Sequence, residues 1–219
     1  MTGWLSGKTV HLAGVHPAIE AGLNAAGATL SPAGPSDIFV HFAPAPPYVP
    51  AHEQSHADWR QTLDAGLDQR FLQANDYAKQ CRDRGLGGVV LFVGAPERAY
   101  GVDQAAAAGA LGNLTKTLGV EWARDGIRVN TILTHADNAT LGNLAAYMVS
   151  DYAAYVTGAV MGIDGDDVVV LDDCRKRRQV GEGGGPGDDH RGSRDLGQQR
   201  LEREEHDDEV GTGRRVRVA

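Results

Sequence analysis

The chain has 219 residues, a formal net charge of −8, a pI of about 5.4, 42% hydrophobic residues and 6% aromatic residues. This length suits one domain with a core of its own, and the acidic balance excludes general nucleic-acid binding, which needs a basic surface. The two cysteines lie in unrelated contexts and give no disulfide framework, which makes a reducing compartment the default.

The N-terminus shows no basic-then-apolar signal pattern. No apolar run approaches the roughly 18 residues that a membrane span requires. We therefore expect a cytoplasmic protein with neither a membrane nor a nucleic acid as partner.

Short apolar segments alternate with helical ones along the first three quarters of the chain. In chain order they are a strand at Lys8–Gly14, a helix at Pro17–Ala26, a strand at Asp37–Ala43, a helix from Asp58 to Gly85, a strand at Gly88–Gly94, a helix at Gln104–Ala123, a strand at Ile127–Leu133, a helix at Leu141–Ser150 and a strand at Ala159–Ile163. Strands that alternate with helices predict an α/β fold with a doubly wound parallel sheet.

Two apolar stripes recur at helical spacing within the two long helices. They comprise Trp59, Leu63, Leu67 and Phe71 in the first helix, and Leu111, Leu114, Leu118 and Trp122 in the second. Both stripes fit either a core or a subunit interface, and the pattern alone leaves the two open.

The composition changes after about Asp172. The rest of the chain is rich in charge and glycine and poor in apolar residues, so it cannot bury enough surface to fold. We expect one domain over residues 1–171 and a disordered tail over residues 172–219. The basic cluster Arg175–Arg178 could be a localisation or anion-binding signal, but a solvated charge run is the favoured interpretation. The Arg/Gly/Asp bias also looks like GC-rich DNA translated out of frame.

Several segments carry a family likeness. They include Val89–Gly94, the run Asn113–Ala123, the motif Asp125–Asn130 and the stretch from Tyr155 that ends at Ile163-Asp164-Gly165. Over roughly residues 5 to 166 the chain resembles the short-chain dehydrogenase/reductase family. The resemblance implies a Rossmann-like sheet and, in ordinary members, an oxidoreductase that uses NAD or NADP.

The cofactor half departs from the family. The family's glycine-rich loop, G-x-x-x-G-x-G, corresponds here to Gly14–Glu20, which keeps only Gly14 and puts the carboxylate of Glu20 near the expected phosphates. The strands and helix that form the adenosine side are replaced by Ala28–Ser36 alone. The fold is therefore expected to be truncated on that side, with no cofactor-binding residue and no cofactor.

The catalytic positions depart as well. The family uses an Asn, a Ser, and a Tyr and Lys four residues apart, where the Lys lowers the pKa of the Tyr for proton exchange. Alignment places Gly66, Gly94, Gln104 and Ala108 at these positions. A shifted register would make Tyr100 the acid, but Gln104 would then stand for the Lys and carries no charge. We expect no catalytic residue.

Histidines offer weaker signals. The stretch from His52 to His56 matches the zinc motif H-E-x-x-H, yet prolines crowd its front, so it is interpreted as a loop with Ser55 or Asp58 capping the next helix. Asp164, Asp166 and Asp167 lack calcium-loop spacing. We expect no metal site. The remaining candidates are interpreted as ordinary strand-end residues, although the last two would face the cleft: His11, His41 and His135.

The substrate side is reduced too, because Thr134-His135 replaces the family's Pro-Gly and the lid shrinks to about Ala136–Gly142. The two long helices, the short helix and the closing strand match best, and in the family these form subunit interfaces. Our first hypothesis is a non-catalytic subunit that assembles with itself or with an active relative. The alternative is a ketoreductase-like enzyme using NAD or NADP through a non-standard site, and a further alternative is a decayed or frame-disrupted gene product.

Overall fold

The computed structural model describes residues 3–32, 34–95 and 101–163. Their strands are β1 (Thr9–Ala13), β2 (Thr29–Ser31), β3 (Ile38–Phe42), β4 (Gly88–Gly94), β5 (Ile127–Thr134) and β6 (Val160–Ile163). Their α-helices are α1 (Pro17–Ala25), α2 (His56–Leu63), α3 (Gln69–Asp83), α4 (Val102–Glu121) and α5 (Ala139–Val149), with shorter helical turns at η1 (Asp64–Asp68), η2 (Trp122–Asp125) and η3 (Asp151–Ala153). The predicted division at residue 171 and the tail lie outside the described residues and stay predictions.

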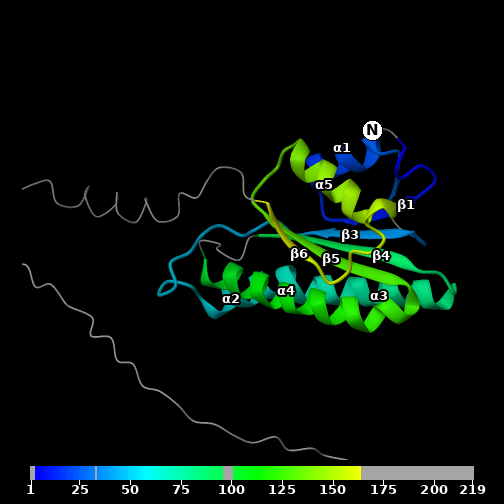
Figure 1. Ribbon diagram of the computed structural model, residues 1–219. Helices are drawn as coiled ribbons and strands as arrows, with labels where there is room; N and C mark the ends of the chain where they lie inside the picture. Colours follow the sequence, from blue (N-terminus) through cyan, green and yellow to red (C-terminus); the bar gives the residue numbers. More distant parts are fainter. Residues whose placement is uncertain (1–2, 33, 96–100, 164–219) are drawn as a thin grey trace, which may run out of the picture. The chain divides into compact units, whose positions relative to one another are not determined.

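One parallel sheet organises these elements, with the strand order β2-β1-β3-β4-β5-β6. Helices α1 and α5 cover one face of the sheet, and α2, α3 and α4 cover the other (Figure 1). After β1 the chain forms β2 on one side of β1, and then crosses to the other side of β1 to form β3 and the later strands. The strand order therefore reverses between β1 and β3. The predicted doubly wound Rossmann-like fold is confirmed.

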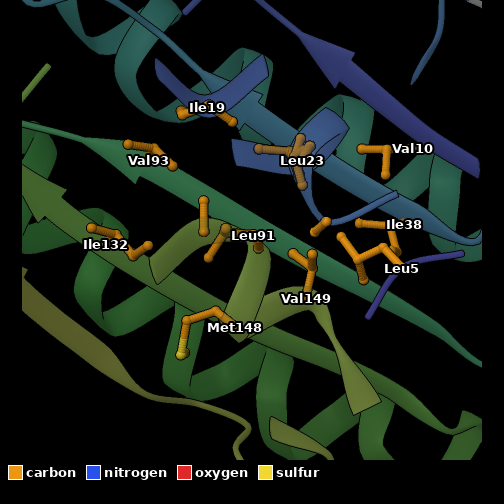
Figure 2. Packing of buried hydrophobic residues seen from close by; sticks show 14 of the residues in the cluster. Leu5, Val10, Ile19, Leu23, Ile38, Leu91, Val93, Ile132, Met148 and Val149 are labelled. Carbon is orange, nitrogen blue, oxygen red and sulfur yellow. The ribbon is translucent and has the colours of Figure 1, made fainter. Parts of the chain in front are cut away.

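Each face of the sheet carries its own hydrophobic core. Under α1 and α5, residues such as Ile19, Leu23 and Met148 pack against Val10 and Leu91 of the strands (Figure 2). Parallel strands covered on both faces need apolar side chains on both, and β4 meets this with Val90 to Val93, all at most 1% exposed.

The second core settles one of the two stripes. Leu111, Leu118 and Trp122 are at most 4% exposed and pack against the sheet, so their stripe is core. In the first long helix Phe71 is 39% exposed and Leu72 is 51% exposed, so part of that surface faces solvent.

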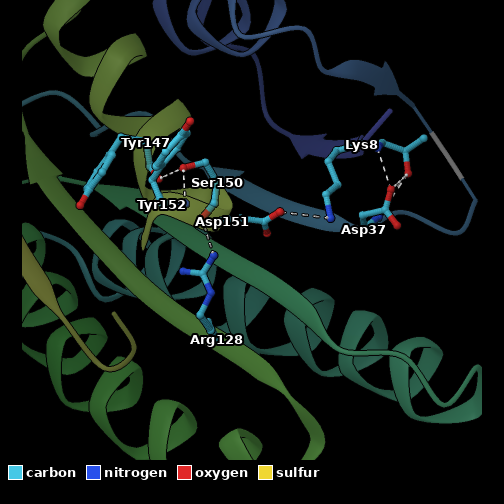
Figure 3. Close-up of polar contacts among 8 residues, drawn as sticks. Lys8, Asp37, Arg128, Tyr147, Ser150, Asp151 and Tyr152 are labelled. Carbon is cyan, nitrogen blue, oxygen red and sulfur yellow. Dashed lines mark hydrogen bonds and ion pairs between the residues drawn. The ribbon is translucent and has the colours of Figure 1, made fainter. Parts of the chain in front are cut away.

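The Asp125–Asn130 motif holds in place the end of α5 and the connection from α5 to β6. The Arg128 guanidinium donates to four carbonyl oxygens, those of Met148, Ser150, Ala153 and Val156, at 2.9 to 3.3 Å. Figure 3 shows Arg128 reaching toward Ser150 from below the loop. Asn130 adds a hydrogen bond from Nδ2 to the Val156 oxygen. This part of the family resemblance therefore reflects a structural role of Arg128 and Asn130.

Two features depart from the predicted elements. A three-residue strand, β2, lies within Ala28–Ser36, which was expected only to connect, and it pairs with β1. The single long helix expected from Asp58 is divided by a π-helical turn at Asp64–Asp68. No described helix is long and apolar enough to cross a membrane.

Candidate functional site

A cavity of about 210 Å³ opens at the carboxyl ends of the strands. Its lining comes from the segments after β1, β3, β4 and β5, among them His16, Phe42, Gly94, Thr134 and His135. In open α/β sheets the ligand crevice lies at the strand ends where the order of strands reverses. This cavity lies at that place, beside the step from β1 to β3.

The turn after β1 places the N-terminus of α1 at this cleft. Gly14 has a φ of +91°, and a Cβ there would lie 2.1 Å from the Phe42 carbonyl oxygen, so glycine is required by close packing. Pro17 opens α1 as predicted. His16 is 7% exposed, lines the cleft, and its Nδ1 has no hydrogen-bond partner among the described residues. Glu20 lies in the first turn of the helix.

A larger cavity of about 390 Å³ adjoins the first and shares the Ala43–Ala45 segment, Gly94 and Ala95 with it. The four positions aligned with the family's catalytic residues all line this larger cavity: Gly66, Gly94, Gln104 and Ala108. The alignment therefore brought together residues from η1, β4 and α4 that do converge. Three of them have little or no side chain, which is a physical reason for open space between the helices and the sheet.

The π-helical turn contributes to this wall. Such turns insert an extra residue into a helix and often lie at functional sites. Here the turn carries Ala65 and Gly66 at the cavity lining, and Arg60 spans it with ion pairs to Asp64 at 2.7 Å and Asp68 at 3.1 Å.

One charged side chain enters the larger cavity, and the sequence analysis missed it. Arg70 of α3 lines the cavity yet is only 2% exposed. Its Nη1 donates to the His41 carbonyl oxygen at 3.4 Å, and its Nε has no partner in the described part of the chain. Burial lowers the pKa of Arg70 to about 10, so the group is still cationic at neutral pH.

His41 does not balance that charge. Burial, and next the positive charge of Arg70, lower the pKa of His41 to about 4, so its imidazole is neutral at pH 7. Its Nδ1 has no partner within the described ranges. Among the histidines expected at the cleft, His135 lines the smaller cavity, whereas His41 lies beside Arg70 and lines neither cavity.

The remaining sequence candidates lie elsewhere. Ser55 caps α2 as predicted, because its Oγ accepts from the Asp58 amide at 3.1 Å. His52 lies 3.4 Å from Glu53 in an exposed pair, and no group of three metal-binding side chains occurs among the described residues. His11 stacks on Phe39. Tyr100 and Asp164 to Asp167 lie outside the described residues.

Comparison with known proteins identifies the fold and the family. A family model described as enoyl-(acyl carrier protein) reductase matches residues 18–136. The chain is 27% identical to 3beta-hydroxysteroid dehydrogenase 1 of Eggerthella lenta over 60% of this chain and 63% of that enzyme. It is 26% identical to a galactitol 2-dehydrogenase of Cereibacter sphaeroides over 65% of this chain and 70% of that enzyme. The match therefore spans about two thirds of the length of these relatives.

Solved structures share the architecture. A short-chain dehydrogenase/reductase from Mycobacterium marinum superposes with a TM-score of 0.68 at 18% identity, covering 75% of this chain and 96% of that one. A 4-hydroxyisoleucine dehydrogenase complexed with NADH and succinate gives a TM-score of 0.56 at 22% identity, covering 60% and 69%.

These comparisons correct the expectation that no cofactor is involved. The relatives are dehydrogenases, and structures of this fold hold NADH or, in an Agrobacterium tumefaciens protein, NADP. The expectation gave too much weight to Glu20 and to the shortness of the stretch Ala28–Ser36, which contains β2. The strand-end cleft itself is present, and His16, whose buried Nδ1 has no hydrogen-bond partner among the described residues, is part of its lining.

Proposed function

This chain belongs to the short-chain dehydrogenase/reductase family, and we propose that it is a nicotinamide-cofactor-dependent oxidoreductase with a non-standard active site. One observation carries the proposal. The positions aligned with the family's catalytic residues converge on a cavity that opens beside the strand-end cleft. The fold thus presents a cavity of about 390 Å³ next to the strand-end cleft, which is where ligands bind in open α/β sheets.

The residues that would hold the cofactor follow from the cleft. His16 lines the cleft and directly precedes the first turn of α1, so its side chain and the nearby amides at that helix N-terminus are the groups that would hold a cofactor. Amides at a helix N-terminus suit a pyrophosphate, while Glu20 in the first turn weakens that attraction. When bound, the nicotinamide supplies or accepts a hydride.

The residues that exchange a proton with the substrate must differ from those that the family uses. No described residue lining the larger cavity can exchange a proton near neutral pH, since Arg70 is its one ionisable group. The smaller cavity is lined by His16 and His135, and an imidazole can both donate and accept a proton. We assign proton exchange with the substrate to these histidines or to water reaching them.

A cofactor titration tests the proposal. We expect the fluorescence of NADH or NADPH to show saturable binding to the full chain. Ala136→Trp, which fills the smaller cavity, should abolish it. Ala123→Trp is the matched control, because Ala123 is exposed and lies just before the amino end of β5, whereas the cleft lies at the carboxyl ends of the strands. Binding that neither tryptophan changes, or no binding to the unmodified chain, would contradict the proposal.

Assembly is the second candidate function, and exposed apolar side chains on the helical layer favour it. Phe71 and Leu72 of α3 and Val120 of α4 are 39%, 51% and 78% exposed. Sedimentation should show self-association, and Leu72→Glu with Val120→Lys should weaken it without touching the core. A monomer at all concentrations would oppose this candidate. Cooperative urea unfolding of the same sample tests the alternative of a decayed gene product.

A further inference from the structure

Arg70 differs from the other arginines of the described chain that have partners. Arg60 is paired with two aspartates, Arg82 with Asp125 at 2.7 Å, and Arg128 with four backbone oxygens. Arg84 donates one hydrogen bond to the Ser36 oxygen at 3.2 Å, but it is exposed to water. Arg70 is only 2% exposed, yet it makes one long hydrogen bond and has no carboxylate partner in the described ranges. A buried charge without a partner is costly, so its presence calls for a compensating anion.

The Arg70 side chain forms part of the lining of the larger cavity. A Cβ built on Gly94 would lie 3.3 Å from Arg70 Nη2, so the cationic group reaches the carboxyl end of β4. Glycine at this position leaves room for the guanidinium, and a larger side chain would crowd it. The charge therefore lies at the place where the family's serine would stand.

None of the other described residues that line the cavity carries a negative charge to neutralise it. The wall is mainly apolar, with Ala107, Ala108 and Leu111 on one side. Gln104 is engaged, since its Nε2 donates to the Pro46 oxygen at 2.7 Å. The one acid buried among the described residues, Asp103, accepts from Thr62 Oγ1 at 2.6 Å and does not line the cavity.

We propose that the larger cavity binds a small molecule that carries a carboxylate, with the carboxylate on Arg70 and an apolar body against Ala107, Ala108 and Leu111. Guanidinium presents paired donors that match a carboxylate, and the low-polarity surroundings strengthen that contact. The proposal rests on the proposed function for its meaning, because it assigns the oxidoreductase an acidic substrate class. The anion also explains why a charge with no carboxylate partner among the described residues is kept at the lining of a cavity of about 390 Å³.

Calorimetry with two matched probes tests the proposal on the full chain without cofactor. Cyclohexanecarboxylate supplies an apolar ring and a carboxylate, and cyclohexanecarboxamide is its neutral counterpart of the same shape. We expect the acid to bind at least about tenfold more tightly than the amide, a difference of about 1.4 kcal/mol. Equal binding of the two, or no saturable binding of the acid, would overturn the proposal.

Variants then place the probe. Arg70→Met should weaken the acid by at least about tenfold and leave the amide unchanged. Arg124→Met removes the same charge from an exposed site and should change neither. If Arg70→Met does not fold, Ala65→Phe decides, because Ala65 is exposed at the cavity and its enlargement should exclude both probes. Acid binding that survives both variants would place the probe elsewhere and refute the site.

The cofactor titration separates the two proposals. If the acid binds through Arg70 while NADH and NADPH do not bind, the oxidoreductase proposal fails and the anion site stands. If the cofactor binds but the protein binds the acid and the amide equally well, the anion site fails and the oxidoreductase proposal stands.

Discussion

Replacing Arg70 by methionine tests whether a buried charge is kept for binding at a cost in stability. Arg70 is 2% exposed, and its only hydrogen bond to a described residue is the 3.4 Å contact to the His41 oxygen. Methionine is of similar length, fills irregular space and needs no polar partner. Because the substitution removes an uncompensated buried charge, we expect the free energy of unfolding to rise by about 1–3 kcal/mol at pH 7.

Urea denaturation at pH 7 measures this change, with Arg124→Met as the exposed control expected to lie within about 0.5 kcal/mol of the unmodified chain. Adding cyclohexanecarboxylate at ten times its dissociation constant should stabilise the unmodified chain by about 1.4 kcal/mol and the Arg70 variant hardly at all. The ligand would thus reduce the difference in unfolding free energy between the unmodified chain and the Arg70 variant. A variant that loses more than about 2 kcal/mol without ligand would show that the guanidinium is structural, and the reasoning would be wrong.

Three further predictions concern single groups. His41 has a pKa of about 4 in the fold against about 6.5 when unfolded, so the unfolded state binds more protons in this window and stability falls as pH drops below about 6.5. Unfolding at pH 7.5 and 5.0 should therefore show about 2 kcal/mol less pH dependence in His41→Leu, and an unchanged slope would contradict it. Tyr77→Phe should lower the unfolding free energy by about 1–2 kcal/mol in urea titrations, because its hydroxyl donates to the Asp37 oxygen at 2.6 Å and accepts from the Val89 amide at 3.1 Å. Glu20→Gln should tighten NADPH binding about two- to fivefold in the fluorescence titration, since it removes a like charge from the first turn of α1, and weaker binding would show that Glu20 does not face the phosphates.

Much of the fold could be predicted because buried parallel strands leave a clear trace. Val89 to Val93 is apolar without alternation, and such a run between glycines indicates a strand covered on both faces. The strand Thr29–Ser31 was missed because three residues carry no usable periodicity, and Pro32 follows directly. The π-helical turn was missed for another reason: Leu63 and Leu67 keep helical spacing across it, so the extra residue leaves no mark in the apolar pattern.

The site was predictable in location but not in chemistry. Counting from family motifs placed Gly66, Gly94, Gln104 and Ala108 correctly around one space. Arg70 was missed because the run from Asp68 is polar and would normally face solvent. The one available signal was its spacing, four residues after Gly66, which places both on one face of a helix.

The loss of the family's side chains and the presence of Arg70 are physically connected. Glycine at position 66 and 94, and alanine at 108, open the space that larger side chains would occupy, and Gly94 in particular leaves the guanidinium 3.3 Å from where a Cβ would be. A serine at 94 and an arginine at 70 would compete for the same volume. The chain therefore did not simply lose a reaction centre around an unchanged scaffold. Its larger cavity combines small residues at the aligned positions with a buried cation that has no carboxylate partner among the described residues, and that combination is more consistent with an altered ligand than with an empty relic.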